Sequence, residues 1–107
     1  MANSCVRSCE LCGRDGLKLT RHHLVPRTMH SKTRIRKRWT AEELNTRVAW
    51  LCRSCHNQVH AVLSEKELAD TWNELALLRE HPVILRYVEW VRKRNPRGRI
   101  RARREQR

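Results

Sequence analysis

Hydrophobic and polar residues alternate over residues 17–23, with leucines at two alternate positions. This alternation predicts a short strand, which runs into the double histidine His22 and His23 and is ended by Pro26. A second apolar run, over residues 48–51, predicts a second short strand. A helix is expected to follow it directly, from about residue 54 to about residue 63.

Two further helices are predicted by capping boxes. Thr40 is followed three positions later by Glu43, and this pair would open a short helix that ends at about Asn45. Ser64 and Glu67 repeat the pattern and would open a longer helix. Each pair satisfies two backbone N–H groups that a helix start otherwise leaves without partners.

Apolar residues beyond position 64 recur at helical spacing on two successive stripes. Pro82 would occupy the first position of the helix that carries the second stripe, and this helix is expected to end near Asn95. The two amphipathic helices predict a helical hairpin over residues 64–95, and its exposed stripe could pair two copies, so a monomer and a homodimer both remain open. The stripes consist of Leu68, Trp72, Leu75 and either Leu78 or Arg79, and then of Ile84, Tyr87, Val88 and Val91.

The chain of 107 residues has room for one domain, but it lacks Phe and has little aliphatic bulk. Five cysteines could compensate, either as disulfides or as ligands of a structural metal. Their odd number and the two C-x-x-C spacings favour metal ligation in a reducing compartment. Charged residues interrupt the first twenty positions, and no apolar run approaches membrane-spanning length, so we expect a cytoplasmic protein without a membrane partner.

The formal net charge is +13, from 24 Lys and Arg against 11 Asp and Glu. Such a charge favours a polyanionic partner, and we expect DNA in double-stranded form. Residues 1–8 are expected to form a flexible leader and residues 96–107 a disordered, Arg-rich tail. Trp39 and Trp50 could stack on bases, although packing inside the protein is their expected use.

A basic segment over residues 27–39 carries six cations and no acid, which predicts an exposed loop. In an extended conformation, the arginines at every second position would share one side and could follow a phosphate backbone. Arg27, beside the double histidine, is the best candidate for contact with the reacting phosphate. The nucleic-acid-binding residues predicted here are Arg27, Lys32, Arg34, Arg36, Lys37 and Arg38.

The segment CRSCHNQVH, residues 52–60, raises the question of one metal site or two. On a helix, His56 and His60 are separated by about 40° and can bind one ion together, whereas Cys55 and His56 are separated by about 100°. This geometry favours two sites. The four cysteines of the two C-x-x-C pairs would complete a closed structural zinc site that links distant segments; they are Cys9, Cys12, Cys52 and Cys55.

The histidines allow other interpretations. His56 and His60 could be ordinary surface residues of a helix, or they could join Cys9 and Cys12 in a zinc-finger quartet that leaves two cysteines without a role. The double histidine favours a third possibility, because the zinc site would bring it near the helix. Three imidazoles with a vacant coordination position are typical of a catalytic metal site.

The motifs CELCG, LTRHHLVPR, Asn45 and LCRSCHNQVH occur in an order that resembles the HNH endonucleases, the ββα-metal class. The resemblance covers residues 9–63, while residues 64–94 are similar to the helical extension of some small stand-alone bacterial HNH proteins. It implies an α+β fold: a small ββα-metal, treble-clef-like core held by a Cys₄ zinc site, followed by the helical hairpin.

The resemblance also implies roles for individual residues. His23 would be the general base, and Asn45 the central Asn whose side-chain carbonyl orients it. His22, His56 and His60 would hold one divalent catalytic ion, which by the preference of imidazole ligands is Mn²⁺, Ni²⁺, Co²⁺ or Zn²⁺, with Mg²⁺ also possible.

The implied activity is metal-dependent hydrolysis of DNA phosphodiester bonds, an endonuclease reaction that leaves 5′-phosphate and 3′-hydroxyl ends. His30 could lie near the site, whereas Asn57 would point away from the helix face that carries His56 and His60. The alternative is a non-catalytic, zinc-binding nucleic-acid-binding protein.

Overall fold

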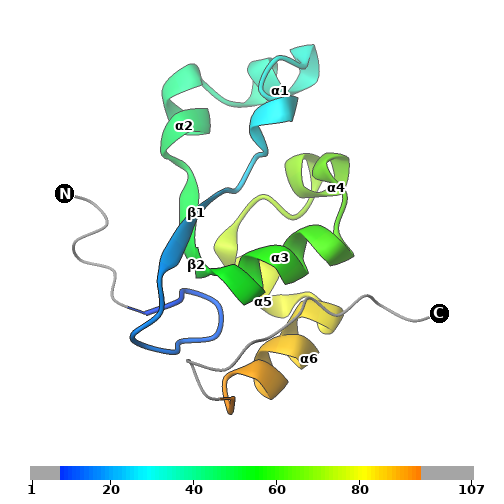
Figure 1. Ribbon diagram of the computed structural model, residues 1–107. Helices are drawn as coiled ribbons and strands as arrows, with labels where there is room; N and C mark the ends of the chain where they lie inside the picture. The colour runs from blue at the N-terminus through cyan, green and yellow to red at the C-terminus, as the bar shows by residue number, and fades with distance from the viewer. Residues whose placement is uncertain (1–7, 95–107) are drawn as a thin grey trace.

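Two antiparallel strands organise the fold (Figure 1). In the computed structural model, which describes residues 8–94, strand β1 (Leu19–His23) pairs along its whole length with strand β2 (Val48–Cys52). The register places Leu19 opposite Cys52 at one end and His23 opposite Val48 at the other. Both strands were expected from the apolar pattern. The sheet therefore has a cysteine end and a histidine end.

Helix α3 (Arg53–Val62) begins directly after β2 and packs on both strands. Its buried side includes Cys55 and Val59, so the helix rests on the sheet with these residues inward. The predicted helix over residues 54–63 is confirmed. The domain is thus α+β. The elements β1, β2 and α3 carry the three clustered histidines together with Cys52 and Cys55, whereas Cys9 and Cys12 precede β1.

The connection between the strands is helical. It contains a 3₁₀ turn η2 (Arg27–Met29), helix α1 (Thr33–Arg38) and helix α2 (Ala41–Thr46), which lie beyond one end of the sheet (Figure 1). The prediction of an exposed basic loop over residues 27–39 is therefore wrong. The reason is Ile35, which is 1% exposed and anchors α1 in a small second core. The other members of this core are Val25, Met29, Leu44 and Ala69.

Because α1 is a helix, Arg34, Arg36 and Arg38 do not all lie on one side, as they would in an extended chain. Arg34 and Arg38 are one turn apart and both contact Asp70. Nε of Arg34 donates to Oδ1 of Asp70 at 3.0 Å, and Nη1 of Arg38 donates to the Asp70 backbone oxygen at 3.1 Å. Arg36 faces elsewhere, into a pocket described below. In the basic segment, Arg34 and Arg38 are therefore bound to Asp70, whereas Arg36 is available to a ligand.

Both predicted capping boxes are present. Oγ1 of Thr40 accepts from the Glu43 N–H at 3.0 Å, and Oε1 of Glu43 accepts from the Thr40 N–H at 2.8 Å. Ser64 and Glu67 make the same pair of bonds at 3.1 and 2.9 Å. Each cap stabilises its helix by about 1 kcal/mol, which matters for helices of only six residues.

The C-terminal region is not a two-helix hairpin but three short helices, α4 (Glu65–Asp70), α5 (Leu75–Glu80) and α6 (Pro82–Val91). Asn73 explains the break between the first two. It is 1% exposed, and its Nδ2 donates to the Ala69 oxygen at 2.8 Å, a carbonyl at the end of α4. A helix continued through this position would have needed that carbonyl for its own ladder.

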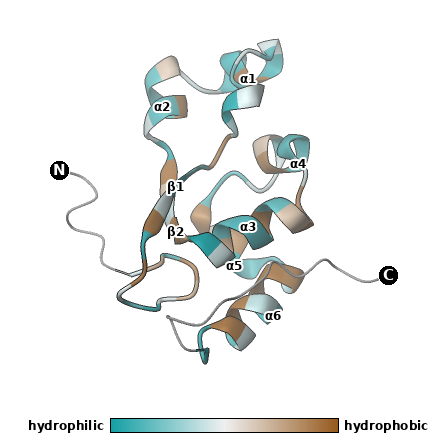
Figure 2. Cartoon of the chain, in the orientation of Figure 1, coloured by the Kyte–Doolittle hydropathy of each residue, from teal (hydrophilic) through white to brown (hydrophobic). Residues whose placement is uncertain are grey.

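The main core joins the helical extension to the rest of the domain. Residues of α5 and α6, including Leu78, Ile84 and Val91, lie in one cluster with the four paired cysteines and Leu51. Figure 2 shows hydrophobic residues concentrated on β2 and α6 and hydrophilic ones on α1. Residues 64–94 are therefore packed on the segment 9–63 instead of forming a separate unit.

Some expectations concern residues outside the described range, namely Cys5, most of the leader 1–8 and the tail 96–107. Within residues 8–94 the longest helices have ten residues, and none has the length and hydrophobicity needed to cross a bilayer.

Candidate metal centres

The four paired cysteines meet at the cysteine end of the sheet and form the cysteine cluster: Cys9, Cys12, Cys52 and Cys55. All are buried and none forms a disulfide. Their four Sγ atoms lie within 4.8 Å of one another, and those of Cys12 and Cys52 are 3.9 Å apart. A tetrahedral zinc ion with bonds of about 2.3 Å places its sulfurs roughly 3.8 Å apart. The residues present therefore fit a four-coordinate zinc ion.

The turn that carries the first two cysteines has the shape of a zinc knuckle. The backbone N–H groups of Leu11 and Cys12 both donate to Sγ of Cys9, at 3.4 Å each. The N–H of Gly13 donates to the Cys9 oxygen at 2.9 Å and closes the turn, with a φ of +77° that favours glycine. These two N–H groups would stabilise the Cys9 thiolate that a zinc ion binds.

Arg14 is an unexpected member of this site. It is only 7% exposed, yet neither ion pair that the described residues form with carboxylates involves it. Instead, its guanidinium lies 3.3 Å from Sγ of Cys12 and 3.6 Å from Sγ of Cys52, and donates to Oγ of Ser54 at 3.0 Å. A buried cation requires a compensating negative charge. Four thiolates around a zinc ion carry a net charge of −2 and provide it.

Charge in the cluster is shared between Arg14 and the sulfurs. Burial lowers the pKa of Arg14, but its hydrogen bonds to Cys12 and Cys52 outweigh burial and leave that pKa raised. Hydrogen bonds from Cys12, Cys55 and Cys9 hold the pKa of Cys52 below its ordinary value. Hydrogen bonds within the cluster raise the pKa of Cys9 and of Cys55, so the thiolate is favoured at Cys52, beside Arg14, and a zinc ion would favour deprotonation of the others.

Three histidines meet where β1 contacts α3, toward the histidine end of the sheet, and form the histidine cluster: His22, His56 and His60. Their ring centroids are 5.0 to 5.2 Å apart in every pair, and one nitrogen from each lies within 4.8 Å of the others. His22 comes from β1, while His56 and His60 are one turn apart on α3. The arrangement can bind one ion with three imidazoles, and no carboxylate of the described residues belongs to the group.

The surroundings of His22 favour a metal ion bound at the histidine cluster. It is fully buried, and neither Nδ1 nor Nε2 has a hydrogen-bond partner among the described residues. A buried polar group without a partner costs about 1–3 kcal/mol. A metal ion bound to one nitrogen would remove most of that cost, so the residues present fit a metal ion.

The histidines are held in the neutral form that coordinates metals. Burial, assisted by the charges of His56, His60 and His23, lowers the pKa of His22 to about 3. Burial likewise lowers the pKa of His56 to about 4, with contributions from His60 and Arg53. Desolvation also lowers the pKa of His60, while the nearby Glu65 carboxylate acts in the opposite direction.

A cleft of about 220 Å³ opens beside the histidine cluster. His23, the residue after His22, lines its wall, and Arg27 lines it as well, next to the double histidine as expected. Burial lowers the pKa of His23, and electrostatic interactions with Arg21, His30 and Arg27 lower it further. His23 is therefore a neutral imidazole beside the cluster. The lining residues are Arg21, His23, Pro26, Arg27, Thr28, His56, His60 and Glu65.

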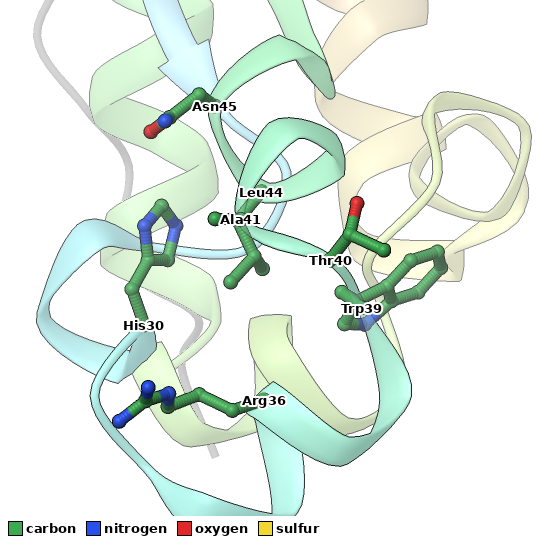
Figure 3. Close-up of a pocket in the computed structure, with 7 residues that line it drawn as sticks. All are labelled: His30, Arg36, Trp39, Thr40, Ala41, Leu44 and Asn45. Atoms are coloured by element: carbon green, nitrogen blue, oxygen red, sulfur yellow. The ribbon is translucent and has the colours of Figure 1, made fainter.

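A second pocket of about 410 Å³ lies between α1 and α2. Figure 3 shows the ring of His30 between the side chains of Asn45 and Arg36, with Trp39 on the opposite side. Nε2 of His30 donates to the Val25 oxygen at 2.7 Å, since a carbonyl can only accept. Asn45 thus faces His30 and does not line the His23 cleft. The pockets are adjacent, because the rings of His30 and His23 are 5.8 Å apart.

Sequence reasoning assigned no role to three residues at these sites: Arg14, Thr20 and Glu65. Thr20 contacts His56, and Glu65 lines the cleft, where its Oε1 accepts from the Thr28 hydroxyl at 2.7 Å. Arg14 comes two positions after the first C-x-x-C pair, and this proximity was the one available indication. Nothing in the spacing of Thr20 or Glu65 distinguishes them from surface positions. Trp39 packs internally as expected, with the Arg47 guanidinium 4.2 Å from its ring centroid.

A comparison with known proteins finds a relative along most of the chain. The uncharacterized protein YisB of Bacillus subtilis is 40% identical over 98 residues, which cover 90% of this chain and 84% of YisB. No family model and no solved structure matches the sequence at a significant level. Identity of this extent indicates common descent, and the chain therefore belongs to the same family as YisB.

Proposed function

We propose that the protein is a metal-dependent DNA endonuclease of the HNH type. Its core would be a ββα-metal fold, in which β1, β2 and α3 carry the catalytic ion and the cysteine cluster holds a structural zinc ion. The alternative is a non-catalytic, zinc-binding nucleic-acid-binding protein. Both share the zinc site and the basic charge, so the histidines decide between them.

One observation carries the proposal: the histidine cluster is separate from the cysteine cluster and opens to a cleft lined by a fourth histidine. A structural zinc site of four cysteines does not require a second cluster of three imidazoles, one of them fully buried. Three protein ligands leave coordination positions for a phosphate oxygen and water, which is the arrangement of catalytic metal sites.

His23 would act as the general base. It lies in the cleft beside the cluster, and its lowered pKa keeps it able to accept a proton from water at neutral pH. Arg27, in the same cleft, would bind the reacting phosphate and stabilise its developing negative charge. The histidine cluster would hold a divalent ion, which would supply Lewis-acid stabilisation of the negative charge that develops during hydrolysis. The expected products have 5′-phosphate and 3′-hydroxyl ends.

The role of Asn45 differs from that of the central Asn of the family. Its backbone oxygen accepts from Nη2 of Arg21 at 2.8 Å, and its side chain lines the pocket with His30. Because His30 stacks edge-on against His23, Asn45 would act on the base through His30 and not by direct contact.

Double-stranded DNA is the proposed substrate because of the charge. The net charge of +13 attracts a polyanion, and both pockets are lined by arginines. We further propose that the enzyme acts in the cytoplasm, as a monomer or homodimer.

A nicking assay on supercoiled plasmid tests the proposal. Purified, zinc-loaded protein should convert the plasmid to nicked or linear form when Mn²⁺ is added, and a chelator should prevent this. The matched control is the His23→Ala protein, prepared identically to exclude a contaminating nuclease. DNA binding without any cleavage, over the divalent ions Mg²⁺, Mn²⁺, Ni²⁺, Co²⁺ and Zn²⁺, would instead favour the binding protein.

A further inference from the structure

The side chain of Thr20 connects β1 to a histidine of the cluster. Its Oγ1 lies 2.8 Å from the backbone oxygen of Leu51, across the sheet, and 2.7 Å from Nδ1 of His56. A hydroxyl has a single hydrogen to donate, and a backbone oxygen can only accept. The hydrogen of Thr20 is therefore directed to Leu51.

The direction of this hydrogen bond determines which ring nitrogen of His56 carries the hydrogen. Since the hydroxyl hydrogen points to Leu51, Oγ1 of Thr20 can only accept from Nδ1 of His56. Nδ1 must then carry the ring hydrogen. A neutral imidazole has one N–H, so Nε2 keeps its lone pair and is the nitrogen of His56 available to a metal ion.

We propose that Thr20 is a positioning residue of the histidine metal centre, which selects the Nδ1–H tautomer of His56 and holds its ring with Nε2 toward the ion. The inference rests on the proposed function in taking the histidine cluster as a metal site. Histidine ligands commonly donate the N–H of their second ring nitrogen to an oxygen acceptor, and loss of that acceptor typically weakens metal binding about 10- to 100-fold.

The geometry of β1 explains how one strand can both supply the ligand His22 and orient the ligand His56. Thr20 and His22 are two positions apart on β1, so their side chains lie on the same face of the sheet, which α3 covers. Thr20 reaches the Nδ1 side of His56, and the His22 ring lies 5.1 Å from the His56 ring. A single strand thus supplies one ligand and orients another.

The test compares Thr20→Val with Thr20→Ser. Valine keeps the shape and the strand preference of threonine but removes the hydroxyl, whereas serine keeps the hydroxyl. The first readout is the ¹⁵N chemical shifts of the His56 ring in zinc-loaded protein without a second metal. The second is calorimetric titration with Co²⁺, which does not displace zinc from four thiolates. Zinc content and thermal unfolding report whether each variant is folded.

The wild type and Thr20→Ser should show the Nδ1–H tautomer and similar Co²⁺ affinity. Thr20→Val should show an altered tautomer and Co²⁺ binding weakened about tenfold or more. A folded Thr20→Val protein with unchanged tautomer and unchanged Co²⁺ affinity would overturn the inference. If these effects appear but the wild type never cleaves DNA, the endonuclease proposal fails while the role of Thr20 stands.

Discussion

Cys55 and His56 are adjacent in the sequence, but their side chains belong to different clusters. Cys55 is fully buried in the cysteine cluster, whereas His56 is half-buried and lies with the buried His22 and the exposed His60. The 100° step of the helix separates the two directions, so α3 contributes to both clusters from consecutive positions. The same helical turn can therefore hold a closed structural site and an open one.

This separation predicts different consequences for neighbouring substitutions. Cys55→Ser should abolish cooperative folding, because a structural zinc ion contributes about 10–16 kcal/mol, as much as the whole stability of a small domain. His56→Ala should retain a cooperative thermal transition and its structural zinc. Circular dichroism with zinc analysis measures both. A stable, zinc-free Cys55→Ser protein would rule out a structural role for the cysteine cluster.

Loss of the general base should affect catalysis alone. His23→Ala is expected to reduce plasmid cleavage by about 10²- to 10⁴-fold, because general-base catalysis contributes rate enhancements of that size. Thermal stability and DNA affinity, measured without added divalent ions, should be close to those of the wild type. Cleavage at the wild-type rate would exclude His23 as the base.

The arginines of α1 should differ in their contribution to DNA binding. Arg36 lines the pocket beside His30 and has no ion-pair partner within residues 8–94, whereas Arg34 is paired with Asp70. We expect Arg36→Ala to weaken binding and to reduce the slope of log affinity against log salt by about 1, as for one lost phosphate contact. Arg34→Ala is the matched control and should leave the slope nearly unchanged. Equal slopes for both variants would remove the special role of Arg36.

Tyr87 reports whether α6 covers the cysteine cluster. It is the only tyrosine of the chain and is 5% exposed, and burial raises its pKa to about 12. Its phenolate absorbance should therefore appear well above pH 10 in the folded protein and near pH 10 after unfolding. Because the folded-state pKa is the higher one, the stability from this group is complete below pH 10 and is lost as the pH rises toward 12. Tyr87→Phe should remove that loss, and a native midpoint near 10 would mean that the ring is open to solvent.

Much of the framework was predictable because it depends on local patterns. Both strands, α3 and the capping boxes at Thr40 and Ser64 follow from short-range periodicity and backbone hydrogen bonding. The ligand pairs within each cluster followed from the C-x-x-C spacing and from the helical separation of His56 and His60. In these cases neighbouring residues determine the geometry, whereas His22 was assigned to the histidine cluster through the resemblance to the HNH endonucleases.

The remaining features depend on contacts between distant segments. Ile35 is one apolar residue among cations, and its burial against Leu44 and Ala69 turned an expected loop into a helix. Asn73 ends α4 through a side-chain bond, although the apolar stripe continues past it. Arg14 would normally be assigned to the surface, and only the sulfurs of Cys12 and Cys52 explain its burial. None of these contacts has a signature in local spacing.

The most direct measurement is the metal content of the full-length protein before and after mild chelation. The protein is loaded first with zinc and then with Co²⁺, and we predict one bound ion for each cluster. Mild chelation should remove the Co²⁺ and the cleavage activity together, while the zinc ion and the fold remain. A single tightly held ion, with both Cys55 and His56 among its ligands, would contradict the account.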